Sequence, residues 1–177
     1  MTEYRRAWLP GGTWFFTVVL ADRQSSLLVE NIEYLRTSYA EVRQNHPFKT
    51  VAMVVLPEHL HVIWTLPPGD TDYATRWRLL KTGFSHRIPA GEYRRPSLVQ
   101  KAERGIWQRR YWEHLIRDED DLRRHVDYIH FNPVKHGHVQ RAQDWSFSTF
   151  GRYVAKGLLP RDWGSAEDFA DGFGERE

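Results

Sequence analysis

The sequence contains no cysteine, which excludes disulfide bonds and zinc sites built from thiolates. This absence fits a reducing compartment, so we expect a cytoplasmic protein. Long hydrophobic runs are also missing, since no apolar segment approaches the roughly 18 residues that suggest a membrane span. The charged start of the chain, Met-Thr-Glu-Tyr-Arg-Arg, is not followed by a hydrophobic stretch. We therefore expect neither a membrane span nor a signal peptide.

The chain has 177 residues, 41% of them hydrophobic, with eight tryptophans and nine phenylalanines. This is enough for one domain with a sizeable core. We expect a single domain over residues 1–160 and an acidic C-terminal tail, residues 161–177. The net charge is only +2 but is unevenly distributed. Residues 76–117 hold eleven Lys or Arg and three Glu, a local charge of +8, whereas the tail holds two Arg and six acidic residues, a local charge of −4.

The basic segment 76–117 carries Trp and Tyr between its cations. This composition suits contact with a phosphate backbone and exposed bases, although a solvated loop has the same charge. The acidic tail could lie over the same surface and compete with DNA, or serve only as a solubilising end. The candidate DNA-binding residues are Tyr4, Arg5, Arg6, Arg94, Arg95, Lys101, Arg104, Arg109 and Arg110.

Residue patterns predict an α+β fold. Enrichment in β-branched and aromatic residues predicts strands at 13–20, 50–56, 59–66 and 107–116. Apolar residues at helical spacing and capping residues predict helices at 31–45, 72–87 and 118–131, the last bounded by Pro133, and a short helix at 145–156. Residues 88–106 are expected to form a long loop. This order predicts a ferredoxin-like (RRM-like) antiparallel sheet with helices on one face, plus an added helix and a C-terminal extension.

Two histidines one residue apart, His59 and His61, lie in the third expected strand. Alternate residues of a strand point to the same face, so the two imidazoles can hold one divalent metal. Two ligands are too few for a closed structural site, and Asn132 could supply a neutral oxygen. Paired histidines in strands are also often surface residues or hydrogen-bonded structural groups.

Tyr128 lies in the third expected helix. At about 100° per residue, Leu122, Val126 and Ile129 form a narrow apolar stripe, and Tyr128 lies well off it. Asp121, His125 and Asn132 share the side of Tyr128, and Asn132 follows it by one turn. We therefore expect this tyrosine on a polar face, where a metal beside its hydroxyl suggests nucleophilic attack on a phosphodiester.

A set of motifs extends across residues 4–163. They are Tyr-Arg-Arg at 4–6, Gly-Gly-Thr-Trp-Phe-Phe-Thr at 11–17, Leu-Pro-Glu-His-Leu-His at 56–61, Trp-Glu-His at 112–114, Val-Asp-Tyr-Ile at 126–129, Asn-Pro-Val-Lys-His-Gly at 132–137 and Asp-Trp-Ser-Phe-Ser-Thr-Phe at 144–150. With these motifs the chain resembles the REP-associated tyrosine transposases, a bacterial branch of the HUH single-strand transposases.

The resemblance implies a specific chemistry. His59 and His61 match the paired metal-binding histidines, Tyr128 matches the nucleophile, and Asn132 matches a polar third ligand. It also implies Mg²⁺ or Mn²⁺, although imidazole ligands alone favour Zn, Ni or Cu. Such enzymes cleave single-stranded DNA through a 5′-phosphotyrosine and recognise repetitive extragenic palindromes, which form hairpins. A monomer in the bacterial cytoplasm, associated with the nucleoid, is expected.

Two other functions remain open at this point. A domesticated transposase could bind palindromes without cleaving them, although His59, His61 and Tyr128 are all present. An RNA-binding module shares the ferredoxin-like layout, but the sequence lacks the Lys/Arg-Gly-Phe/Tyr-Gly/Ala-Phe-Val-x-Phe/Tyr string typical of such modules. Of the remaining histidines, His125 could contact a phosphate, whereas structural roles are expected for His114, His130, His136 and His138.

Overall fold

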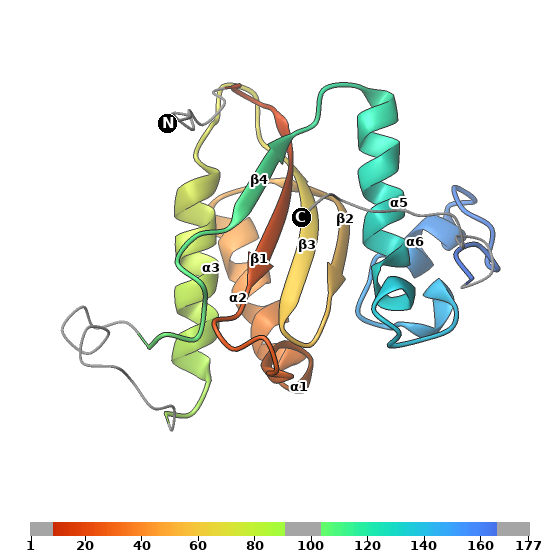
Figure 1. Cartoon of the computed structure of the whole chain (residues 1–177). Helices are drawn as coiled ribbons and strands as arrows, with labels where there is room; N and C mark the ends of the chain where they lie inside the picture. The colour runs from red at the N-terminus through yellow and green to blue at the C-terminus, as the bar shows by residue number, and fades with distance from the viewer. Residues whose placement is uncertain (1–8, 91–103, 166–177) are drawn as a thin grey trace, which may run out of the picture.

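The computed structural model describes residues 9–90 and 104–165 (Figure 1). The elements follow in the order β1 (Thr13–Val19), α1 (Leu27–Glu30), α2 (Ile32–Asn45), β2 (Lys49–Val55), β3 (His59–Thr65), α3 (Tyr73–Arg87), β4 (Trp112–Leu115), α5 (Glu119–Lys135), a 3-10 turn (Ala142–Asp144) and α6 (Phe150–Ala155). No helix in these described ranges is long and apolar enough to cross a membrane.

The four strands form one antiparallel sheet in the order β2-β3-β1-β4. This is the strand order of a ferredoxin-like fold, so the predicted fold class is confirmed. β2 and β3 form the expected hairpin, and β1 and β3 occupy the two central positions of the sheet. The register places Thr17 of β1 opposite His61 of β3 and opposite Trp112 of β4. Residues of β1, β3 and β4 thereby meet on one face.

Helices cover both faces of this sheet. On one face, Trp14, Phe16 and Val18 of β1 pack against α2 and α3 in the larger core cluster. In that cluster Trp64 stacks on Trp77 with ring centroids 4.2 Å apart. On the opposite face a smaller cluster joins Phe15, Ala52, Val54, Ile63, Val126 and Ile129, because α5 lies across β2 and β3 (Figure 1). The added helix thus covers the second face of the sheet.

Two expected boundaries are wrong. The fourth strand spans only Trp112–Leu115 instead of 107–116, although Trp107 makes an isolated bridge to Leu20. Residues 108–111 between this bridge and β4 are not in a strand, and the ring of Trp107 packs against Phe84 of α3. The third expected helix does not end before Pro133 but continues to Lys135. A proline in a helix removes one hydrogen bond, but tertiary packing outweighs this loss because Asn132, Pro133 and Val134 are all buried.

Other differences are smaller. The short helix expected at 145–156 is confirmed only as α6, because residues 145–149 are not helical, and the 3-10 turn and α1 were not expected. Of the two capping candidates in the sequence, Thr71 and Asp72, it is Asp72 that caps α3, since its carboxylate accepts the amide hydrogen of Thr75 at 2.9 Å. Several predictions lie outside the described residues: those for Tyr4, Arg5, Arg6, Arg94, Arg95 and Lys101, and those for residues 166–177 of the acidic tail.

Candidate active site

The two histidines of β3 point to the face that α5 covers. His59 and His61 are only 4% and 3% exposed, and their ring centroids lie 4.9 Å apart. The alternation of a strand explains this arrangement, because residues i and i+2 share a face. Two imidazoles are therefore held side by side beneath a helix, as the spacing predicts.

Each of these histidines is held by a hydrogen bond through one ring nitrogen. Nδ1 of His59 lies 2.8 Å from Oε1 of Glu58, and Nδ1 of His61 lies 2.9 Å from Oγ1 of Thr17. Nε2 of His61 is buried and has no hydrogen-bond partner among the described residues. A histidine whose second nitrogen is held by a hydrogen bond is typical of metal ligands, because that bond fixes the tautomer and orients the ring.

Burial also sets the charge of these rings. Burial lowers the pKa of His61 well below its usual value, and the neighbouring His59, His136 and Lys135 act in the same direction. Burial lowers the pKa of His59 as well, against the opposing effect of the Glu58 carboxylate. Both imidazoles are therefore neutral at pH 7, the form that can ligate a metal.

α5 brings Asn132 and Tyr128 to the same place. Asn132 is fully buried and lies close enough to His59 for its side chain to raise the pKa of that ring, but neither its Oδ1 nor its Nδ2 makes a hydrogen bond of normal geometry within the described part of the chain. One turn earlier, the ring of Tyr128 lies 5.1 Å from the ring of His61. The four residues expected at the site therefore converge. The buried amide of Asn132 and Nε2 of His61 are the kind of groups that a bound metal would satisfy, so these residues fit one.

The surroundings of Tyr128 differ from the expected polar face. The tyrosine is half-buried and packs at the margin of the smaller core cluster. Its ring contacts Phe15 edge-on, with centroids 6.1 Å apart. The helical period alone could not predict this, because α5 lies against two strands that supply Phe15 and His61.

Two further residues lie beside the site. Nζ of Lys135 is 4.9 Å from the ring centroid of Tyr128, and the ring of His136 lies 5.3 Å from that of His59. Burial lowers the pKa of His136, and the proximity of His59 adds to this effect. The proximity of Lys135 to Tyr128 could have been predicted from the sequence, since Lys135 follows Tyr128 by two turns of the helix. His136 was expected to be only structural.

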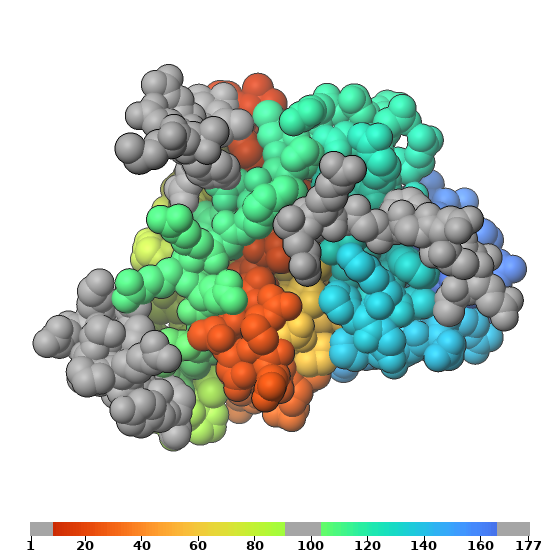
Figure 2. All heavy atoms as spheres, viewed as in Figure 1, coloured from red at the N-terminus to blue at the C-terminus, as the bar shows by residue number. Residues whose placement is uncertain are grey.

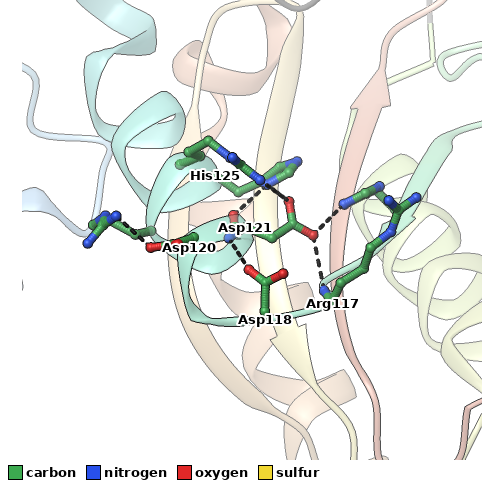
Figure 3. A network of polar contacts seen from close by, with 8 residues as sticks. Arg117, Asp118, Asp120, Asp121 and His125 are labelled. Atoms are coloured by element: carbon green, nitrogen blue, oxygen red, sulfur yellow. Dashed lines mark hydrogen bonds and ion pairs between the residues drawn. The ribbon is translucent and has the colours of Figure 1, made fainter.

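A second polar cluster lies toward the start of α5 (Figure 3). Oδ2 of Asp121 accepts the amide hydrogen of Arg117 at 3.0 Å and lies 2.9 Å from Nε2 of His114. Nδ1 of His125 lies 3.1 Å from Oδ1 of Asp121 and 2.8 Å from its carbonyl oxygen. Burial raises the pKa of Asp121, but the hydrogen bonds from His114 and Arg117 and the nearby imidazoles outweigh it, and the pKa lies below its usual value.

This second cluster could also hold a metal by composition, since the ligand atoms of His114, Asp121 and His125 lie within 4.8 Å of one another. Its polar atoms, however, already bond to each other and to the backbone. The helical period predicts that Asp121 and His125 share one side of the helix, but nothing in the sequence connects either of them to His114. A strand residue and a helix residue had to be brought together for that contact, which no local pattern signals.

The candidate DNA-binding residues that the structure describes differ in their surroundings. The guanidinium of Arg104 donates hydrogen bonds to the carbonyl oxygens of Ser85, Ile88 and Pro89 at the end of α3, so it has a structural role. Arg109 and Arg110 are exposed just before β4.

Two buried histidines of a central strand therefore lie beside a tyrosine of α5, and together they form one candidate active site. Comparisons with known proteins identify the family that the chain belongs to. No family model matches the chain. It is 50% identical over 173 residues to the REP-associated tyrosine transposase of Escherichia coli K12, covering 97% of each chain. It is also 46% identical over 169 residues to a Haemophilus influenzae protein described as a transposase of the same kind, covering 95% of this chain and 96% of the relative.

A solved structure agrees with these relatives. The REP-associated tyrosine transposase bound to a REP hairpin superposes with a TM-score of 0.81 at 48% sequence identity, and the match covers all of both chains. The chain therefore belongs to the REP-associated tyrosine transposases.

Proposed function

We propose that this protein cleaves and transfers single-stranded DNA at repetitive extragenic palindromes through a 5′-phosphotyrosine on Tyr128. The observation that carries the proposal is the convergence of Tyr128 with two neutral, buried imidazoles and an unpartnered amide. The relative whose structure contains a REP hairpin supports hairpin DNA as the substrate. We also propose a monomer as the working unit, associated with the nucleoid through its DNA substrate.

The metal would be held by Nε2 of His59, Nε2 of His61 and Oδ1 of Asn132. A divalent cation bound there supplies Lewis acidity toward the scissile phosphate and its leaving oxygen. We propose Mg²⁺ or Mn²⁺, because phosphate and water oxygens would complete the shell around so few protein ligands, and hard cations prefer oxygen. Glu58 and Thr17 orient the two imidazoles through hydrogen bonds to Nδ1 of His59 and Nδ1 of His61.

The covalent step uses the phenol oxygen of Tyr128. It forms a bond to the phosphorus while the bond from phosphorus to the 3′-oxygen breaks. The phenol loses its proton and the departing 3′-oxygen gains one, so the products are a phosphotyrosine and a 3′-hydroxyl. An unperturbed tyrosine has a pKa of about 10 and is a weak nucleophile at neutral pH, so orientation by the packed site matters. Phe15 and His61 confine the ring, and the ammonium of Lys135 places positive charge beside it.

A covalent intermediate also explains strand transfer. The phosphotyrosine conserves the energy of the phosphodiester, so a second 3′-hydroxyl can attack it and rejoin the DNA. A hydrolytic nuclease would lose that energy to water.

The test is covalent capture of DNA. A labelled hairpin with a single-stranded flank, incubated with Mn²⁺ or Mg²⁺, should give a protein–DNA adduct on a denaturing gel. Tyr128→Phe removes one oxygen and should abolish the adduct while hairpin binding persists. Tyr34→Phe, an exposed tyrosine on α2, is the matched control and should react normally. Tight hairpin binding by the wild type without any adduct would instead identify a DNA-binding protein that does not cleave.

A further inference from the structure

An exposed tryptophan begins the edge strand of the sheet. Trp112 is 46% exposed, and β4 is the last strand in the sheet order. The segment that includes β4, green in Figure 2, reaches the surface in that view. Single exposed hydrophobic side chains are common on protein surfaces, but this one lies on the same face of the sheet as the candidate active site.

The tryptophan belongs to a row of parallel rings. Its ring is inclined by only 5° to that of His114, with centroids 5.7 Å apart. His114 in turn stacks on His125, with centroids 4.7 Å apart and planes inclined by 15°. The row leads toward the candidate nucleophile, because Phe15 contacts Trp112 at 5.6 Å and Tyr128 at 6.1 Å between ring centroids.

Asp121 fixes the orientation of this row. Its carboxylate lies 2.9 Å from Nε2 of His114 and 3.1 Å from Nδ1 of His125, so both imidazoles are held by one buried group. The carboxylate is itself fixed by the amide of Arg117. A ring that is already oriented loses little conformational entropy when a ligand stacks on it. The cluster thus preorganises the surface that Trp112 exposes.

We propose that Trp112 is a stacking platform for one unpaired base in the single-stranded flank of the DNA hairpin, next to the phosphate that Tyr128 attacks. This inference rests on the proposed function and names the part of the substrate that the platform contacts. Aromatic side chains bind single strands because every unpaired base has a free face to stack on, whereas the bases of a duplex are covered. The exposed Arg109 and Arg110, three and two residues before Trp112, supply positive charge for a neighbouring phosphate.

The experiment measures binding and stacking separately from cleavage. Each variant is made in a Tyr128→Phe background so that the DNA stays intact, and dissociation constants are measured for a hairpin with an unpaired flank and for the same hairpin with no flank. Trp112→Ala should weaken binding of the flanked hairpin about tenfold and leave the flankless hairpin unchanged. Trp112→Phe should retain most of the affinity. Tyr34→Ala, which removes an exposed aromatic ring from α2, is the matched control and should change neither value.

A fluorescent base analogue locates the stacked base. With 2-aminopurine placed at successive flank positions, one position should be quenched on binding, and the quenching should weaken in Trp112→Phe and disappear in Trp112→Ala. Equal losses on both hairpins, an unchanged dissociation constant in a folded Trp112→Ala protein, or no quenched flank position in the wild type would overturn the proposal. If Trp112→Ala does not fold, the 2-aminopurine scan of wild type and Trp112→Phe decides. A failed adduct test alone would overturn the cleavage proposal and leave this result intact.

Discussion

Two histidine pairs lie near Phe15, His59 with His61 and His114 with His125. They differ in the hydrogen bonds that their ring nitrogens make. His59 and His61 keep one ring nitrogen tied to Glu58 or Thr17, and Nε2 of His61 has no partner among the described residues. The pair His114 and His125 shares the carboxylate of Asp121. The proposed metal would bind the first pair, whereas in the second pair the nitrogens that face Asp121 are already bonded within the protein.

The difference has an energetic meaning. A buried polar group without a partner destabilises a folded protein by about 1–3 kcal/mol, and the first pair lies with three such atoms, Nε2 of His61 and both amide atoms of Asn132. A hydrogen bond to a charged group, in contrast, stabilises by about 1.5–3 kcal/mol. The site of His59 and His61 therefore lowers the stability of the fold, whereas the hydrogen bonds of His114 and His125 to Asp121 raise it.

The largest effect is expected where the ligand-receiving pair is broken. His61→Ala should reduce adduct formation by more than about 100-fold, because even an outer partner of a metal ligand is worth about 10–100-fold. The measurement is the initial rate of adduct formation with saturating Mn²⁺ or Mg²⁺, compared with the wild type in excess chelator. His86→Ala, an exposed histidine on α3, should retain the wild-type rate. A wild-type rate in His61→Ala, or in excess chelator, would exclude the metal role.

A change at the second pair, His114 and His125, should instead lower the stability of the folded protein. Asp121→Asn removes the charge that binds His114 and His125 and should lower the free energy of unfolding at pH 7 by about 2 kcal/mol. This corresponds to a fall in Tm of about 4–8 °C for a chain of this size. Since the folded-state pKa of Asp121 lies below its usual value, its contribution is present above about pH 4 and is lost as the pH falls through the folded-state value.

Unfolding curves of both proteins at several pH values check this prediction. The difference in free energy of unfolding between wild type and Asp121→Asn should be largest near pH 7 and should decrease as the pH falls below about 4. Asp120→Asn is the matched control, because Asp120 is exposed and its ion pair with Arg123 lies at the surface, where such pairs contribute little. A gap that stays constant down to pH 3 would contradict a charge-based role for Asp121.

The two clusters also differ in how far the sequence could predict them. Strand alternation places His59 and His61 on one face, and one helical turn places Tyr128 and Asn132 on one side of a helix. That the two pairs meet was expected from the family resemblance, because no local period joins β3 to α5. The contact of His114 with Asp121 joins β4 to α5, and no local period relates them. The strand order could be predicted from the order of helices and strands along the chain. The end of α5 beyond Pro133 could not, because it depends on tertiary burial.

The smallest effect is expected for the outer hydrogen bond of the first pair. Thr17→Val keeps the shape of the side chain but removes the hydroxyl that lies 2.9 Å from Nδ1 of His61. The imidazole then loses its fixed orientation, and adduct formation should fall about tenfold, with a higher metal concentration needed for half-maximal rate. Thr13→Val is the matched control on the same strand and face, since it breaks a hydrogen bond of the same length to Thr65. If the two variants lose activity equally, the loss reflects a weakened sheet, and Thr17 does not position His61.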